Sequence, residues 1–94
     1  MILSPNERLI VVSLYDQPKC PYEIAQELNK QDTAIATNLR KMQQLNLVKY
    51  QRTGIRKYSL TKFGGNLYEL LSTHDASFRD LITEYKNQRK ENYF

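Results

Sequence analysis

Two short stripes of apolar residues with helical spacing, separated by a turn of about three residues, constrain the fold more than any other feature of this sequence. The first stripe consists of Ile24, Ala25 and Leu28. The second consists of Ile35, Leu39 and Met42. Pro21 is expected to open the first helix, and Asn29 is expected to close it, because asparagine tolerates a left-handed backbone better than most residues. The pattern predicts two helices joined by a tight turn.

The second helix of this pair is expected to run from a cap at Gln31 or Asp32 to about Leu45. Because its core positions lie four and three residues apart, they fall on one side of the helix. The opposite face and its flanks carry Thr33, Ala34, Ala36, Thr37, Asn38, Arg40, Lys41 and Gln44. No large apolar residue stands on that outer face.

A helix is also predicted before this pair. Ser4-Pro5-Asn6-Glu7 has the sequence of a capping box with proline at the first helical position. Apolar residues follow at helical spacing, namely Ile10, Val11 and Leu14. Because Pro18 disfavours a helical residue before it, this helix should end at or before Gln17. Lys19-Cys20 is then long enough only for a single bridge of strand.

A β-hairpin and a further helix are predicted after the pair. Residues 47–52 and 55–60 form two strand-like runs around Thr53-Gly54. Thr61 is expected to cap the next helix, although Gly64-Gly65 should weaken its first turns. Its apolar residues are Phe63, Leu67, Leu70 and Leu71.

A break at residues 72–74 is expected before a last helix from about Asp75 to Glu91. Its apolar stripe consists of Phe78, Leu81, Ile82 and Tyr85. Because a small three-helix core with a hairpin offers little spare surface, a partner chain is expected to cover this stripe, and these four residues are the predicted dimer interface. The alternative is that the helix folds back on its own domain.

The order of these elements defines the predicted fold class, which is mainly α with a small β-hairpin (α+β). We expect a winged helix-turn-helix with an additional C-terminal dimerisation helix. Residues 1–73 should form the DNA-binding domain, and residues 74–94 should form the amphipathic terminal helix.

Positive charge is concentrated in one third of the chain, whose net charge as a whole is +4. From Lys30 to Lys62, eight basic residues stand against a single acidic residue, Asp32, a local balance of +7. The basic residues are Lys30, Arg40, Lys41, Lys49, Arg52, Arg56, Lys57 and Lys62. An ordinary solvated surface would mix both signs, so this asymmetry favours a segment that binds a polyanion.

Composition argues against several other classes. No apolar run approaches the ~18 residues that a membrane span requires, and the residues after Met1 lack the pattern of a secretory signal, so the expected location is the cytoplasm. The single Cys20 and the single His74 are too few for a tetrahedral zinc site, and neither a metal ion nor a cofactor is expected. Cys20 is interpreted as a small apolar residue rather than a redox switch, and His74 as a cap or linker residue. No catalytic constellation is visible, so an enzyme is not expected.

Four stretches carry a family resemblance that covers about residues 4–72. They are YEIAQEL at 22–28, TAIATNLRKM at 33–42, QQLNLV at 43–48 and RKYSLTKFG at 56–64. These stretches resemble parts of winged-helix transcriptional regulators of the ArsR and MarR kind. The first resembles their second helix, the second their recognition helix, and the third its exit into the first wing strand. The fourth resembles the second wing strand and the capped start of the next helix. The resemblance implies a DNA-binding regulator.

Two positions depart from the pattern of that family. Asn46 stands where glycine is usual, which a left-handed cap tolerates, and Lys30 occupies a turn position that is more often apolar. Neither departure changes the predicted fold. The cysteine pair of the metal-sensing ArsR members is absent, as is any cluster of histidines, so metal sensing is not inferred from the resemblance.

The candidate DNA contacts follow from the outer face of the second helix of the pair, because an α-helix fits the major groove of B-DNA. Thr33, Thr37 and Asn38 are the candidate base readers, and Ala36 lies among them. Arg40 and Lys41 are expected to contact phosphates or guanine. The alternative for this face is an ordinary solvated helix surface.

The hairpin tip supplies a second set of candidate contacts. Arg52 and Arg56 flank the predicted turn and can reach phosphates or a groove edge, and Lys57 can add to them. The alternative is that these charges protect a strand edge. Tyr50 and Tyr58 are interpreted as half-buried strand residues, with stacking on single-stranded bases as the alternative.

The sequence therefore predicts a sequence-specific, homodimeric regulator of transcription that binds double-stranded DNA and lies at the nucleoid when bound. Two recognition helices would enter successive major grooves about 34 Å apart. One alternative is a winged-helix module that binds proteins and not DNA. Another is an effector-responsive sensor with a ligand pocket between the last helix and the core.

Overall fold

The computed structural model describes residues 3–52, 54 and 56–92, with the backbone alone for residues 89–92. Its elements are α1 (Pro5–Asp16), α2 (Pro21–Leu28), α3 (Asp32–Gln44), β1 (Val48–Gln51), β2 (Lys57–Leu60), α4 (Lys62–His74) and α5 (Ala76–Asn92). This order confirms the predicted fold class. Both strands are shorter than predicted, and Thr53 and Ile55 of the predicted hairpin lie outside the described residues.

Local hydrogen bonds set the helix ends at the predicted caps. The Ser4 hydroxyl accepts a hydrogen bond from the Glu7 amide at 3.2 Å, and the Glu7 carboxylate accepts one from the Ser4 amide at 2.8 Å. The Thr61 hydroxyl accepts a hydrogen bond from the Gly64 amide at 3.0 Å. Asn29 and Asn46 have φ angles of 55° and 62°, which confirms both left-handed caps.

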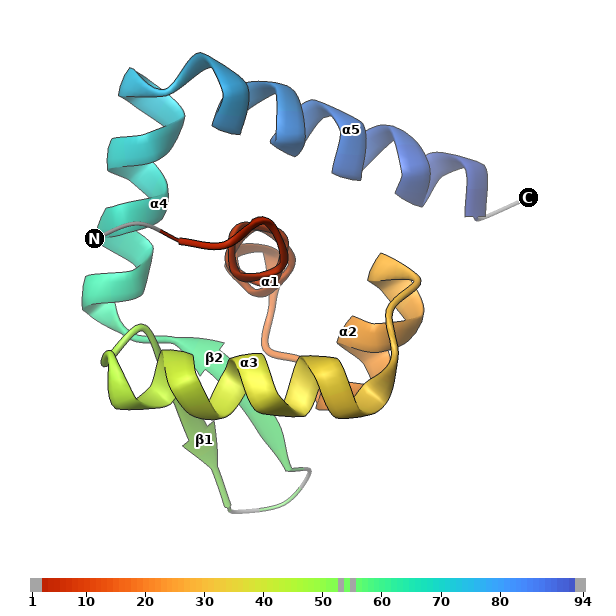
Figure 1. Ribbon diagram of the computed structural model, residues 1–94, viewed down its shortest axis with the longest axis vertical. Coiled ribbons are helices and arrows are strands. Elements are labelled where there is room, and N and C mark those ends of the chain that lie inside the picture. Colours follow the sequence, from red (N-terminus) through yellow and green to blue (C-terminus); the bar gives the residue numbers. More distant parts are fainter. Residues whose placement is uncertain (1–2, 53, 55, 93–94) are drawn as a thin grey trace.

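Helix α1 runs through the centre of the molecule, and the other elements surround it (Figure 1). Its buried apolar residues are Ile10, Val11, Val12 and Leu14. Because consecutive residues of a helix point about 100° apart, this run gives α1 apolar surface on more than one side. The central helix can therefore be covered on opposite sides by two different elements.

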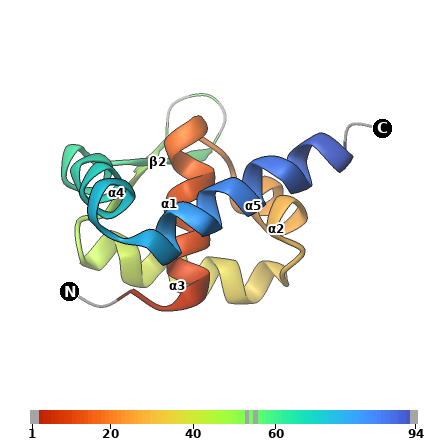
Figure 2. The ribbon, with the colours of Figure 1, turned by 90° about the horizontal axis from the view of Figure 1, so that it is seen from above.

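Helix α5 crosses α1 on the side away from α3 (Figures 1 and 2). The prediction that a partner chain covers the apolar stripe of α5 is corrected by this packing, because α1 of the same chain covers much of it. Within the single chain, Phe78 is 0% exposed and Tyr85 is 5% exposed. Leu81 and Ile82 are half-buried against the same core. The expectation underestimated how much apolar surface α1 offers. Phe78 and Tyr85 are therefore core residues of this chain.

The junction between α4 and α5 also differs from the prediction. Helix α4 continues through residues 72–74 and ends at His74, so the predicted boundary at 73/74 falls in its last turn. The break lies at Asp75, whose carboxylate accepts hydrogen bonds from the Ser77 hydroxyl and from the Ser77 and Phe78 amides. These bonds lower the pKa of Asp75, with the Ser77 hydroxyl contributing most, and they cap the start of α5.

Gly64 holds the hairpin close to α4. A Cβ at this position would collide with the backbone carbonyl of Leu47, just before β1, whereas a Cβ on Gly65 would meet nothing within 4 Å. The sequence alone predicts only that the two glycines weaken the helix. The structure shows that Gly64 is required for a close approach of two backbone segments.

The hairpin is a two-stranded antiparallel sheet in which Tyr50 is paired with Tyr58. Both tyrosines are half-buried, and their ring centroids are 4.9 Å apart, as the strand interpretation predicts. Lys19 forms the predicted single bridge with Tyr58. This bridge attaches the hairpin to the segment between α1 and α2.

Candidate nucleic-acid interface

Helix α3 and the hairpin lie on the same side of the molecule, and α5 lies on the other side of α1 (Figure 1). The inner side of α3 buries the three predicted core residues, Ile35, Leu39 and Met42. The polar face of the helix is thereby turned outward. No described element covers that face.

The predicted contact residues of α3 differ in how far they reach the surface. Thr33, Thr37, Arg40 and Lys41 are exposed, whereas Ala36 and Asn38 are half-buried. Asn38 lies three residues after the buried Ile35, so it stands on the flank of the helix and not at the centre of its outer face. Thr37 and Arg40 occupy the centre.

The hydroxyl of Thr37 is engaged within its own helix. It donates a hydrogen bond to the Thr33 carbonyl at 2.9 Å. Its single hydrogen is therefore used, and the methyl group is the part of this side chain best suited to an apolar contact. The 5-methyl group of thymine is the matching surface in the major groove of DNA.

Lys41 has a partner on α1. Its ammonium lies 3.8 Å from the carboxylate of Glu7, whose side chain is 2% exposed, whereas the Lys41 side chain itself is 63% exposed. Because most of the Lys41 side chain is in solvent, its ammonium is accessible to a phosphate.

The hairpin carries the second group of predicted contacts. Arg52 and Arg56 are exposed, and Lys57 is half-buried. Gly54 between them has a φ of 76°, a conformation that favours glycine in a turn. The positive charge of Lys57 contributes to the lowered pKa of Glu23 in α2, although the main cause there is the hydrogen bond from the Cys20 amide at 3.1 Å.

The basic residues between Lys30 and Lys62 do not all lie on the surface formed by α3 and the hairpin. Lys30 lies beside α5, in a groove that it lines with Glu84, so it does not belong to the α3 face. Lys49 of β1 is exposed on the hairpin, although sequence reasoning did not name it as a contact. Tyr22 in the first turn of α2 is 60% exposed. Exposure of so large an aromatic residue has no signal in the sequence.

The described part of the chain offers no metal site and no membrane-spanning helix. Among these residues, no three or more histidine, cysteine, aspartate or glutamate side chains are grouped so that they could hold a metal ion. None of the described helices combines the length and the apolar character that crossing a bilayer demands. Cys20 is half-buried at the start of α2.

Comparisons with known proteins agree with this geometry. The sequence profile described as bacterial regulatory protein, arsR family, matches residues 4–50. A mutant of ZitR from Lactococcus lactis has a TM-score of 0.73 at 23% identity, over 100% of this chain and 64% of that one. The transcriptional repressor BigR from Xylella fastidiosa has a TM-score of 0.68 at 18% identity, over 79% of this chain and 75% of that one.

Wild-type ZitR in complex with DNA gives a TM-score of 0.64 at 18% identity, over 100% of this chain and 77% of that one. At such identities the likeness shows the fold alone. This chain spans less than two thirds of the ZitR mutant chain, at 64% of its length. No curated protein matches the sequence.

Proposed function

The matched profile covers half of the chain, so the protein belongs to the arsR family of bacterial regulatory proteins, and we propose that it regulates transcription by binding double-stranded DNA as a homodimer. Membership of this family identifies a regulatory protein rather than an enzyme, and it selects the ArsR side of the resemblance over MarR. The proposed place of action is the cytoplasm.

The observation that carries this proposal is the joint placement of α3 and the hairpin on one side of the molecule (Figure 1). The exposed basic residues there are Arg40, Lys41, Lys49, Arg52 and Arg56. Helix α3 would enter the major groove with Thr33 and Thr37, while the hairpin arginines would bind the backbone or the minor groove. Ala36, Asn38 and Lys57 would contribute from the flanks.

A second copy would associate through the exposed edge of α5. Leu81 and Ile82 stand at the two borders of the buried stripe and line grooves of about 210 and 330 Å³ on either side of the helix. Tyr15, which is 45% exposed, lines the larger groove. A two-fold interface uses the same patch from both copies, so a charge at Leu81 would be introduced twice. Sedimentation equilibrium measures the mass of the assembly, which should be that of a dimer for the wild type and lower for Leu81→Glu. A dimer of the same stability in both proteins would contradict this interface.

Salt dependence tests whether the hairpin meets phosphates. For wild-type protein on duplex DNA, the logarithm of the affinity should fall linearly with the logarithm of salt concentration, with about 0.9 in slope for each phosphate contact. Arg52→Ala combined with Arg56→Ala should make the slope shallower. The control Arg79→Ala removes an exposed cation of α5 that lines neither groove beside the helix, and it should leave the slope as it was. Equal slopes for all three proteins would refute the hairpin contact.

Base reading is tested separately at Thr37, where two substitutions divide the side chain. Thr37→Val keeps a methyl group and removes the hydroxyl, whereas Thr37→Ser does the reverse. Because the hydroxyl is engaged with Thr33, valine should preserve the sequence preference selected from a random duplex pool and serine should relax it. If the wild type selects no sequence at all while it binds duplex, the protein is a non-specific binder. If it binds no duplex, a protein-binding winged helix becomes the better account.

A further inference from the structure

Lys19 is a buried cation in the segment between α1 and α2. The residue is 2% exposed, although lysine side chains almost always reach water. Burial of an ammonium group is costly unless charge and hydrogen-bond partners replace the water that it loses. The partners of Lys19 therefore show what holds it in place.

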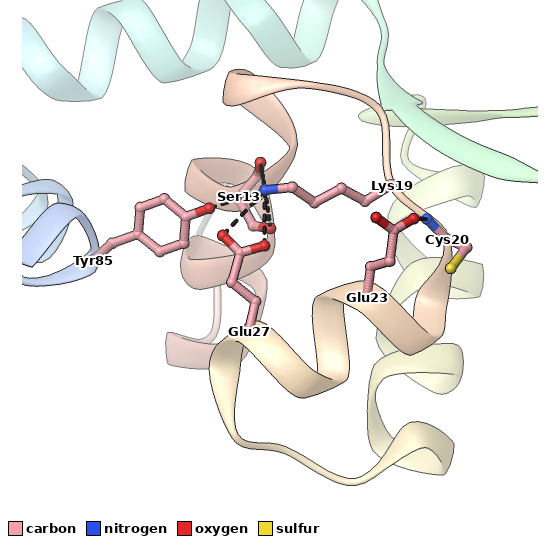
Figure 3. A network of polar contacts seen from close by, with 6 residues as sticks. All are labelled: Ser13, Lys19, Cys20, Glu23, Glu27 and Tyr85. Atoms are coloured by element: carbon pink, nitrogen blue, oxygen red, sulfur yellow. Dashed lines mark hydrogen bonds and ion pairs between the residues drawn. The ribbon is translucent and has the colours of Figure 1, made fainter. Parts of the chain in front are cut away.

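Three helices supply the partners of the Lys19 ammonium (Figure 3). It donates to the Ser13 carbonyl of α1 at 2.7 Å and to the Ser13 hydroxyl at 3.1 Å. It forms an ion pair with Glu27 of α2 at 2.9 Å. It also donates to the Tyr85 hydroxyl of α5 at 2.9 Å. One charged group thus connects α1, α2 and α5.

The backbone of the same residue is bonded to the hairpin. The Lys19 amide donates to the Tyr58 carbonyl at 3.0 Å, and the Tyr58 amide donates to the Lys19 carbonyl at 2.8 Å. Tyr58 lies in β2, directly after Lys57 and two residues after Arg56. A shift of the Lys19 side chain would therefore reach β2, which begins at Lys57 next to Arg56.

We propose that Lys19 is a positioning residue that couples the place of α5, through the Tyr85 hydroxyl, to the place of the hairpin and α2. Of the four contacts described for the Lys19 ammonium, the hydrogen bond to Tyr85 is the one that involves α5. A change in the position of α5 would therefore act on Lys19 through this bond. The effect on DNA affinity rests on the proposed function. The coupling between Tyr85 and the hairpin does not.

Tyr85→Phe tests this link, because phenylalanine keeps the buried ring and lacks the hydroxyl that accepts from Lys19. We expect the amides of Lys19 and Tyr58 to exchange hydrogen with solvent about fivefold faster or more in this variant. Affinity for a duplex selected by the wild type should fall by a similar factor. The salt slope should stay unchanged, since no phosphate contact is removed.

Two further variants give the controls. Leu67→Ala lowers the stability from a half-buried site in α4 that lies outside the network, and it should leave exchange at Lys19 and Tyr58 unchanged relative to neighbouring amides. Lys19→Met should reproduce the effects of Tyr85→Phe, and adding Tyr85→Phe to it should change little further. If Lys19→Met fails to fold, the comparison of Tyr85→Phe with Leu67→Ala still decides.

Exchange at Lys19 and Tyr58 that is no faster in Tyr85→Phe than in Leu67→Ala would overturn the coupling. Faster exchange with unchanged duplex affinity would overturn its role in DNA binding. If the wild-type protein binds no duplex, the proposed function fails, and the exchange data alone decide whether α5 is coupled to the hairpin.

Discussion

Replacement of Gly64 by alanine should destabilise the protein, while the same replacement at Gly65 should stabilise it. Both glycines lie in the first turns of α4, where alanine is favoured over glycine by roughly 0.5–1 kcal/mol. At Gly65 the added methyl group meets nothing within 4 Å, so the full gain should appear. At Gly64 it collides with the Leu47 carbonyl, which belongs to the backbone and cannot rotate away.

The magnitude at Gly64 follows from the two opposing effects. Overpacking of this kind costs roughly 1–3 kcal/mol, and the gain in helix propensity offsets part of it, which leaves a net loss of about 1–2 kcal/mol. For a domain of this size, 1 kcal/mol moves the melting temperature by about 4–8 °C. Gly64→Ala should therefore melt about 5–15 °C below the wild type, and Gly65→Ala should melt a few degrees above it.

Thermal unfolding followed by circular dichroism measures both variants against the wild type. The deciding observation is that the two neighbouring substitutions change the melting temperature in opposite directions. Melting temperatures that rise in both variants would refute the claim that Gly64 is required for the contact between α4 and the segment before β1.

Three other predictions concern caps, pH and metals. Ser4→Ala removes the cap of α1 and should lower the free energy of unfolding in urea by about 1 kcal/mol, whereas Asn6→Ala in the same turn should change it little. The hydrogen bond from the Cys20 amide holds the pKa of Glu23 below its ordinary value of 4.5 in the folded protein. The ionised carboxylate therefore stabilises the fold above pH 4.5, and this contribution is lost as the pH falls through the lower folded pKa. Glu23→Gln should remove this part of the acid dependence, and a carboxyl NMR titration of Glu23 with its midpoint at or above 4.5 would contradict the assignment. Because the sequence has one cysteine and one histidine, too few for a tetrahedral zinc site, the affinity for duplex DNA should be the same in EDTA and in micromolar zinc. A clear effect of zinc would contradict this and would point to carboxylate ligands.

The features that could be predicted from the sequence are those fixed by neighbouring residues. The capping box of Ser4 and Glu7 and the left-handed caps at Asn29 and Asn46 depend on local backbone conformation. The outward face of α3 follows from the spacing of Ile35, Leu39 and Met42. Such patterns need no knowledge of the rest of the fold.

The features that could not be predicted depend on which distant surfaces meet. Phe78 is buried because α1 has apolar surface left to pack against α5. The sequence of α5 alone does not show that this surface exists. The burial of Lys19 contradicts the usual behaviour of lysine and becomes intelligible only when Glu27 and Tyr85 are seen beside it. The place of Lys30 next to α5, away from the α3 face, is likewise set by the turn before α3.

The central proposal is that α3 and the hairpin form the surface that meets DNA. Titration of isotope-labelled protein with duplex DNA, followed through backbone amide chemical shifts, tests this directly. We predict that the largest shifts fall in residues 33–41 and 49–57, with small shifts on the outer side of α4 and on α5. The largest shifts on α4 or α5, or no shifts when duplex is added in large excess, would contradict it.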